Sequence, residues 1–335
     1  MARRALTPSC LALVQCLETA VPQAMVATGI HRCRVGLSGG ADSLALMAAC
    51  AWVRDRRRAS PLAGFQVSAR VVDHRLQPGS DTVAAQAARQ AESHGIDAEV
   101  VAVDVDCGGI GVEAAARDAR HAALREGPEA LILLAHTLDD QAETVLLGLA
   151  RGSGARSLAG MAPRRDRLVR PFLTVRRTDT EQACRDWNLT WWTDPTNDDP
   201  AYTRSRLRRA MGLLEQSLGP ALRENLARTA DLCRADADFL DQLAGATGLV
   251  TFPAPGAPPT DDQLPTQDLA ALPGPIRHRV LLAWLREIGR EAVTREHVLA
   301  VDSLVTDWHG QKSITVPGGQ IARENGMLRR GAATP

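Results

Sequence analysis

The residues best suited to chemistry form one short segment, Ser38-Gly39-Gly40-Ala41-Asp42-Ser43. A strand-like apolar run at residues 34–37 leads directly into it, and the helix-compatible residues 44–47 follow at once. Two glycines allow a tight turn and a close approach to an anion, which the N–H groups at the start of the next helix can bind. The serines add hydroxyl donors, whereas phosphate would repel Asp42 unless a divalent cation lay between them. The segment predicts a phosphate-binding loop with Asp42 as a Mg²⁺ ligand, and a capped strand-to-helix turn without a ligand is the structural alternative.

A second reactive group combines His136 with Asp140 and Glu143. His136 follows the apolar run at residues 130–134, and the two acids fall in the first turns of the helix expected next. Because the carboxyl ends of parallel strands meet at one sheet edge, we expect this group beside the phosphate-binding loop. Its members could hold Mg²⁺, orient an amine nucleophile by charge, or accept its proton. The neighbouring Asp139 could equally serve only the helix dipole.

Three further groups of polar residues are less specific when taken alone. Asp73 and His74 end a predicted strand, which places them at the same sheet edge as the loop. Arg117 and Arg120 share one helix face at i, i+3 spacing, for which an exposed basic face is the simpler interpretation. Arginines crowd between residues 151 and 209, a distribution that suits a phosphate-binding surface and equally a solvated face. These arginines are Arg151, Arg156, Arg164, Arg165, Arg167, Arg170, Arg176, Arg177, Arg204, Arg206, Arg208 and Arg209.

The elements that must position these residues alternate along the first part of the chain. Short apolar runs typical of strands are separated by amphipathic stretches typical of helices, which predicts a doubly wound parallel α/β sheet. After an initial helix at 7–28, the expected strands are 34–37, 66–72, 98–103 and 130–134, and the expected helices are 42–56, 81–93, 112–125 and 138–150. The segment Thr178-Asp179-Thr180-Glu181 has the spacing of a capping box and predicts a further helix.

The last part of the chain has a different pattern. Its expected elements are helices within 202–243, 269–288 and 295–305, a Pro- and Gly-rich linker at 250–265, and strands at 312–316, 320–323 and 327–330. The sequence Asn325-Gly326 is typical of the tight turn of a hairpin. We therefore expect two domains, an α/β domain at 1–210 and a smaller, mainly helical domain at 211–335 that ends in a short β meander.

Composition limits the possible functions. Of the 335 residues, 39 are basic and 39 are acidic, so the overall charge does not indicate a nucleic-acid partner. The seven cysteines are scattered and never have C-x-x-C spacing, which predicts neither a disulfide framework nor a zinc knuckle. No run of about 18 apolar residues occurs, so we expect a cytoplasmic protein without a membrane partner. A homodimer is compatible with the sequence.

The order of the motifs resembles that of a known family. The phosphate-binding loop lacks the pattern G-x-x-x-x-G-K-S/T and instead resembles the signature of the PP-loop ATP pyrophosphatases, which cleave ATP between its α and β phosphates. The motifs that follow it are V-D-H at 72–74, A-H-x-x-D-D-Q-A-E-T at 135–144, R-G-S-G at 151–154 and D-x-x-N at 194–197. With these motifs in this order from about residue 35 to 209, the chain is similar to the tRNA(Ile)-lysidine synthetase family.

This resemblance implies an activity and its partners. ATP, with Mg²⁺, adenylates the C2 carbonyl of the wobble cytidine in an isoleucine tRNA that bears a CAU anticodon. The side-chain amine of free L-lysine then displaces AMP. The resemblance also implies that the domain at 211–335 contributes to tRNA binding.

The resemblance also implies roles for residues. The loop from Ser38 to Ser43 would bind ATP, while His136, Asp140 and Glu143 would line the lysine and cytidine site. Arg117 and Arg120 would contact the activated base or a phosphate. The remaining substrate contacts implied are Asp73, His74, Arg151, Arg204 and Arg206.

Two positions depart from the family pattern, and two other functions remain open. His121 stands where an aromatic residue is usual, and Ser205 stands where asparagine is expected. A PP-loop tRNA thiolase would share the adenylation step but deliver sulfur, which generally needs paired or cluster-binding cysteines. The chain could also be a non-catalytic nucleotide-binding module, but this function would not explain the acidic group or the arginine-rich segment.

Overall fold

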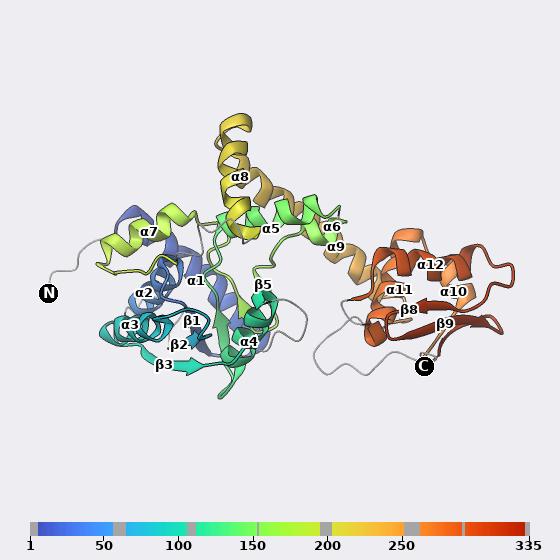
Figure 1. The fold of residues 1–335 in the computed structure, drawn as a ribbon, viewed down its shortest axis with the longest axis horizontal. Coiled ribbons are helices and arrows are strands. Elements are labelled where there is room, and N and C mark those ends of the chain that lie inside the picture. The colour runs from blue at the N-terminus through green and yellow to red at the C-terminus, as the bar shows by residue number, and fades with distance from the viewer. Residues whose placement is uncertain are drawn as a thin grey trace. The chain divides into compact units, whose positions relative to one another are not determined.

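The computed structural model describes residues 6–55, 65–105, 112–152, 154–194, 203–250, 262–289 and 292–331. The chain forms two compact units, Met1–Leu232 and Cys233–Pro335 (Figure 1). The boundary between them falls within the long helix α9 (Leu222–Gly245), further along the chain than residue 210. The difference arises because the preceding helix, α8 (Thr203–Leu218), contacts the α/β unit through helix α5 (Leu138–Ala150).

The first unit is built on a six-stranded, mainly parallel sheet. Its strands, in spatial order, are β3 (Asp97–Ala102), β2 (Gln66–Asp73), β1 (Arg32–Leu37), β4 (Leu131–Leu133), β6 (Leu168–Val169) and β5 (Arg164–Arg165). All neighbours are parallel except β5, which pairs antiparallel with β6. The predicted doubly wound fold is confirmed. The chain order reverses between β1 and β4, and the crevice outside the carboxyl ends of such a strand pair is where ligands bind in these folds.

Helices cover both faces of this sheet. The remaining helices of the unit are α1 (Pro8–Thr28), α2 (Ala41–Asp55), α3 (Ser80–Ser93), α4 (Val112–Arg125), α6 (Ala155–Leu158) and α7 (Arg177–Asp186). Along β4, Leu131 and Leu133 join the core formed with α1, α2 and α7, whereas Ile132 packs with Leu124 of α4. Because successive side chains of a strand point to opposite faces, α4 lies on the other face from α1.

Helix α1 is apolar and long enough, by length and composition, to cross a membrane. In the structure its residues Leu13, Leu17 and Val21 are fully buried in the core, where α1 packs against α2 and α7. The hydroxyl of Thr7 caps the helix by accepting a hydrogen bond from the Cys10 N–H. The apolar face of α1 therefore serves the core of this unit.

The helix at 177–186 exists but begins differently from the prediction. Its N-cap is Arg176, which makes no side-chain capping bond, so the capping box predicted at Thr178 is wrong. The Thr180 hydroxyl instead donates to the Asp42 carboxylate and to the Arg177 carbonyl. A side chain inside the expected capping segment thus contacts the phosphate-binding loop.

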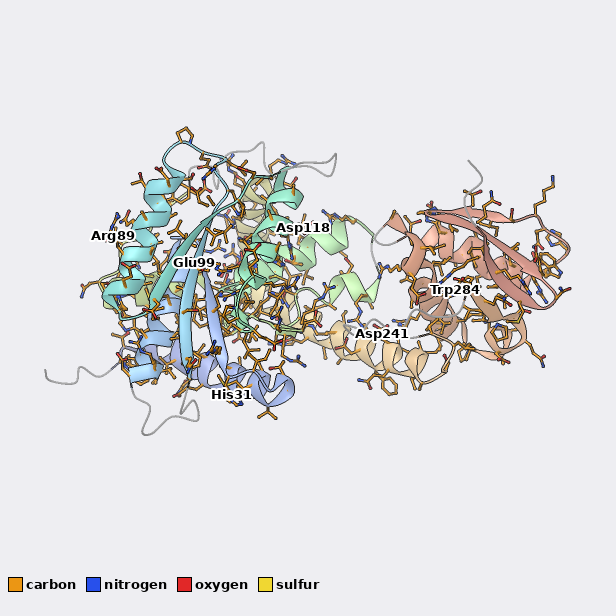
Figure 2. All side chains as sticks on the ribbon, turned by 90° about the horizontal axis from the view of Figure 1, so that it is seen from below. His31, Arg89, Glu99, Asp118, Asp241 and Trp284 are labelled. Carbon is orange, nitrogen blue, oxygen red and sulfur yellow. The ribbon has the colours of Figure 1, made fainter. Side chains whose placement is uncertain are left out.

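The second unit combines helices with a four-stranded antiparallel sheet. Its elements are β7 (Gln263–Pro265), α10 (Thr266–Ala271), α11 (Gly274–Gly289), α12 (Arg295–Thr306), β8 (Ile314–Val316), β9 (Gly319–Glu324) and β10 (Met327–Gly331). The predicted meander is confirmed, with Asn325 and Gly326 both at positive φ in its last turn. Strand β7, at the end of the expected linker, joins the edge of the sheet beside β10. The fully buried Trp284 of α11 anchors the core of this unit (Figure 2).

Candidate active site

The phosphate-binding loop connects β1 to α2 and is held by its own side chains. The Ser43 hydroxyl is buried, accepts from the Ser38 N–H at 3.1 Å and donates to the Gly40 carbonyl at 3.0 Å. Gly39 has φ +83°, and a Cβ there would lie 3.0 Å from the side chain of Val83. Glycine at this position therefore satisfies both the backbone conformation and the close approach of α3.

Asp42 lies in the first turn of α2 and is shared with α7. Its Oδ2 accepts from Arg177 Nε at 3.2 Å, and its Oδ1 accepts from the Thr180 hydroxyl. The pKa of Asp42 is raised to about 6, mainly because burial and the nearby Asp140 outweigh the opposing effects of Arg177 and Thr180. The surroundings of Asp42 thus disfavour its negative charge, and the guanidinium of Arg177 favours it.

A magnesium ion fits this site in only one way. Among the described residues, no group of three or more His, Cys, Asp or Glu side chains could hold a metal ion. Proteins commonly bind Mg²⁺ through one or two carboxylates together with substrate phosphates and water. Within the described residues, each oxygen of Asp42 accepts one hydrogen bond and keeps a second lone pair. The donor set fits an ion that is shared with ATP and does not fit an ion held by the protein alone.

Asp140 caps the start of α5 and also binds Arg177 at the centre of the site. Its Oδ2 accepts from the Thr137 N–H at 2.8 Å, and its own N–H donates to the Thr137 hydroxyl at 3.4 Å, which together form a capping box. Its Oδ1 accepts from Arg177 Nη2 at 2.7 Å. Burial would raise the pKa of Asp140, but Arg177 and the Thr137 bonds outweigh burial and hold it below the usual range.

Glu143 lies one turn further along α5 and is also buried. Its Oε1 accepts from Arg208 Nε of α8 at 3.0 Å. Burial raises the pKa of Glu143, although Arg208 opposes the rise. Asp140 and Glu143 therefore differ in protonation tendency, since the pKa of one is lowered and the pKa of the other is raised.

Three histidines near this edge are kept neutral. The pKa of His136 is lowered to about 3 and that of His121 to about 4, mainly by burial and also by Arg120 and Arg117, although Asp140 opposes the shift of His136. Burial, followed by Arg120, also lowers the pKa of His74. Three buried ring nitrogens, His74 Nδ1, His121 Nε2 and His136 Nδ1, make no hydrogen bond to the part of the chain that the structure describes. Buried polar atoms generally have a partner, so these nitrogens could bind water or a substrate group.

The other predicted residues lie at different places around the site. Asp73 ends β2, where its carboxylate accepts from the Arg75 N–H at 2.9 Å and so supports a local turn. Arg151 is the exposed C-cap of α5. Arg206 is exposed on α8 and donates to the Thr203 hydroxyl at 3.1 Å. Arg204 lies in the first turn of α8, and the predicted motif residue Asn197 lies outside the described residues.

Arg177 joins the predicted groups, although the sequence singled it out only as one of many arginines. Its guanidinium contacts both Asp42 and Asp140, and its N–H donates to Asp139 Oδ2 at 2.8 Å. Burial would lower the pKa of Arg177, but Asp140 and Asp42 outweigh burial and hold it charged. The only sequence signal for this residue is its position after β6, because residues that follow a parallel strand lie at the same sheet edge as the loop.

The described cysteine thiols near the core are protonated. Cys33, Cys50 and Cys184 are free and buried, and burial raises the pKa of each, that of Cys184 to about 12. The Cys184 thiol donates to the Ala41 carbonyl at 3.2 Å. Since the thiolate is the reactive form, these three side chains are inert at neutral pH.

The chain is similar to known proteins over most of its length. Residues 14–214 match a family model described as a PP-loop domain, and residues 264–329 match one described as a TilS substrate binding domain. The chain is 51% identical to a tRNA(Ile)-lysidine synthase from Leifsonia xyli over 303 residues, covering 88% of each chain. It is 44% identical over 322 residues to one from Thermobifida fusca, covering 91% of this chain and 95% of that one. Among solved structures, the U34-tRNA thiolase NcsA from Methanococcus maripaludis has a TM-score of 0.51 at 16% identity, covering 68% of this chain and 80% of that one, which shows a shared fold.

Proposed function

Because this chain belongs to the tRNA(Ile)-lysidine synthase family, we propose that it is a ligase that forms the carbon–nitrogen bond of lysidine. Its substrates are ATP, free L-lysine and an isoleucine tRNA with a CAU anticodon. The wobble cytidine of this tRNA is adenylated at its C2 carbonyl, and the lysine side chain then replaces AMP. We place the reaction in the cytoplasm.

One observation carries the assignment of residues to these two steps. The guanidinium of Arg177 contacts Asp42 beside the phosphate-binding loop and Asp140 at the start of α5. The loop follows β1 and α5 follows β4, the two strands between which the sheet order reverses. A nucleotide phosphate held by the loop and an amine held by Asp140 would therefore meet in one crevice.

In the first step the cytidine C2 carbonyl oxygen attacks the α-phosphorus of ATP, and the bond between the α-phosphorus and the bridging oxygen breaks. The glycine N–H groups of the loop and the start of α2 hold the phosphates. A magnesium ion, when bound with ATP, neutralises the charge of the departing pyrophosphate. Asp42 would hold that ion, and Arg117 and Arg120 would contact the base or its phosphate.

In the second step the lysine amine attacks C2, and the bond from C2 to the oxygen of AMP breaks. The incoming side chain is an ammonium ion that must lose a proton before it can attack. Asp140, whose pKa lies below its usual range, stays charged and binds the ammonium, while Glu143, whose pKa burial raises, accepts its proton. The neutral His136 faces the same region and can accept a hydrogen bond from the cytidine amino group.

A direct assay tests the proposed reaction. Labelled lysine and ATP incubated with an unmodified CAU-anticodon isoleucine transcript should give label that stays on the RNA, and release of AMP should depend on lysine. A thiolase would release AMP without lysine and require a sulfur donor. A nucleotide-binding module would release no pyrophosphate when the tRNA is present.

We further propose that α8, α9 and the second unit bind the tRNA. The supporting features are the arginines that α8 carries and the match of residues 264–329 to a substrate-binding domain. Binding should therefore weaken steeply as salt rises, with a slope of log K against log salt of about −0.7 to −0.9 for each phosphate contacted. Filter binding between low and physiological salt measures this slope.

A pair of arginine variants sharpens the salt measurement. Arg206→Gln on α8 should make the slope shallower by about 1, because one phosphate contact is lost. Arg32→Gln is the matched control, since Arg32 is exposed at the amino end of β1, at the opposite sheet edge. A slope insensitive to salt, or equal effects of the two variants, would contradict the assignment. A homodimer stays a prediction, for which analytical ultracentrifugation is the measurement.

A further inference from the structure

Two pairs of adjacent charged residues face each other where α5 and α7 begin. Asp139 and Asp140 open α5, and Arg176 and Arg177 flank the start of α7. The inner pair, Asp140 with Arg177, faces the phosphate-binding loop through Asp42. The outer pair, Asp139 with Arg176, faces α8 and α9 instead. One junction therefore contacts both the reaction centre and the helices that follow the α/β sheet.

Asp139 is the most buried member of the outer pair. Its side chain is 11% exposed, and its Oδ1 accepts from Arg223 Nη1 of α9 at 2.7 Å. Its Oδ2 accepts from the Arg177 N–H at 2.8 Å. The same carboxylate thus binds α9 with one oxygen and the backbone of the inner arginine with the other.

The arginines extend this contact to acidic residues of α8 and α9. Arg223 Nη2 lies 3.2 Å from Glu215 Oε2 of α8. Arg176 Nε lies 2.9 Å from Glu224 Oε1 of α9, and its Nη1 lies 3.6 Å from Glu215 Oε1. A network of several shared charges holds its members in place more firmly than an isolated surface pair does.

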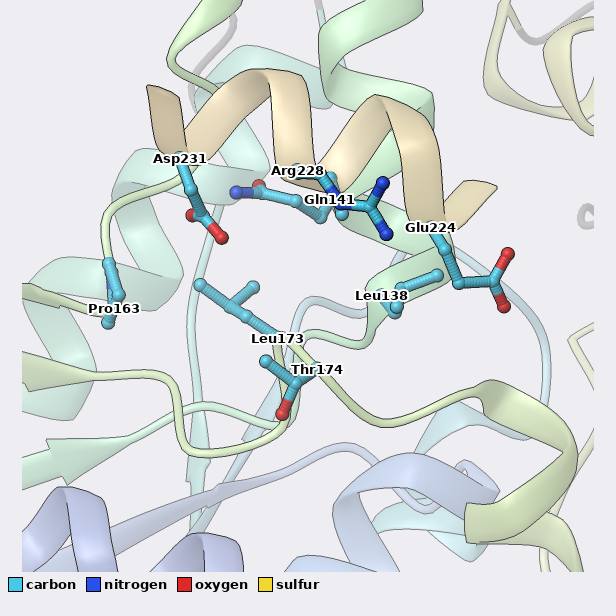
Figure 3. A pocket seen from close by; sticks show the side chains of 9 residues that line it. Leu138, Gln141, Pro163, Leu173, Thr174, Glu224, Arg228 and Asp231 are labelled. Carbon is cyan, nitrogen blue, oxygen red and sulfur yellow. The ribbon is translucent and has the colours of Figure 1, made fainter. Parts of the chain in front are cut away.

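Apolar packing leaves room beside this part of α9. A cavity of about 300 Å³ lies between α9 and the α/β sheet's connecting segments, lined from one side by Leu138, Leu173 and Thr174. Arg228 and Asp231 of α9 line it from the other side (Figure 3). Close-packed interiors fix the position of a helix, whereas a cavity of this size does not. The ion pairs at the start of α9 therefore act together with the buried Ala227 and Ala230 in positioning it.

We propose that Asp139 is a positioning residue that fixes where α8 and α9 lie relative to the reaction centre. A tRNA held by these helices then presents its wobble cytidine to the phosphorus of ATP. The carboxylate acts through Arg223 and through the Arg177 backbone, and it touches no substrate itself. This inference rests on the proposed role of α8 and α9 in binding tRNA.

The test compares Asp139→Asn, Arg223→Gln and the double variant. Asparagine can still accept a hydrogen bond from the Arg177 N–H but loses the charge that binds Arg223. We expect lysidine formation at saturating tRNA to fall about tenfold in each single variant, because a small misplacement of a reactant costs rate. The affinities for tRNA and ATP should stay within about twofold, and the double variant should be no slower than the slower single variant, since both remove one interaction.

Hydrogen exchange gives a second measurement that does not depend on catalysis. Peptides within residues 203–232 should exchange faster in Asp139→Asn, because the helices open more often when the network is broken. Glu99→Gln is the control. Glu99 lies on β3, the edge strand farthest from β6 and β5 (Figure 2), and its carboxylate pairs with Arg70 of β2 at 2.5 Å. It should change neither the rate nor the exchange.

Two outcomes would overturn the inference. One is unchanged exchange in residues 203–232 of Asp139→Asn, and the other is additive loss of rate in the double variant. A wild-type protein that forms no lysidine would refute the proposed function, and the exchange measurement would still decide whether Asp139 positions the helices.

Discussion

Asp42→Asn should abolish adenylation of the tRNA while the fold stays intact. Asparagine keeps the shape of the side chain and an oxygen that can accept from Thr180, but it loses the charge that would hold Mg²⁺ against the phosphates. Losing one preorganised contact to charge that develops in a transition state typically costs a factor of about 10² to 10³. Release of pyrophosphate in the presence of tRNA should fall at least that far.

A second carboxylate of the same helix provides the control for Asp42. Asp55→Asn changes the other end of α2, where the Asp55 carboxylate lies exposed beside Arg54. This variant should release pyrophosphate at the wild-type rate. Wild-type release by Asp42→Asn, in a protein with an unchanged melting temperature, would remove Asp42 from the reaction.

Asp140→Asn should separate the two steps of the reaction. Its amide oxygen can still accept from the Thr137 N–H, so the cap of α5 remains, whereas Asp140→Ala would lose the cap together with the charge. Adenylation should continue in part, because Asp42 and the loop are unchanged. Transfer of lysine should fall by about 10²-fold or more, because the ammonium loses the carboxylate that holds it for attack.

Single-turnover experiments with ATP labelled at the α-phosphate measure both steps of the Asp140→Asn variant. Labelled adenylate should accumulate on the RNA and convert slowly to lysidine. Asp81→Asn is the matched control, since Asp81 is also an acidic residue in the first turn of a helix, α3, but is exposed, whereas Asp140 pairs with Arg177. Equal loss of both steps in Asp140→Asn would instead place Asp140 in the adenylation step.

The loop and its flanking elements could be predicted because their signals are local. An apolar run, two glycines and a helix-forming stretch follow one another within residues 34–47, and each has its own physical preference. The turn at Asn325-Gly326 is similar, since both residues tolerate positive φ. Where neighbours in sequence determine the conformation, the sequence was sufficient to predict the structure.

The remaining features depend on partners far apart in the chain. Strands β5 and β6 have two residues each, too few for a periodic pattern, and form because β4 offers a pairing edge. Arg177 meets Asp42 across 135 positions of sequence, and no local pattern separates it from the other arginines nearby. Thr178 was assigned to a helix cap from local spacing alone, whereas the acceptor of the nearby Thr180, Asp42, lies in another element.

The protonated thiols of the core also affect how this protein can be labelled. Alkylating reagents react with exposed thiolates, so Cys33, Cys50 and Cys184 should be spared by a fluorophore maleimide under native conditions. Cys16 and Cys233 are only partly buried and would need replacement first, together with Cys107, which lies outside the described residues. A cysteine then introduced on the exposed face of α8 could carry a dye that reports directly on the docking of RNA.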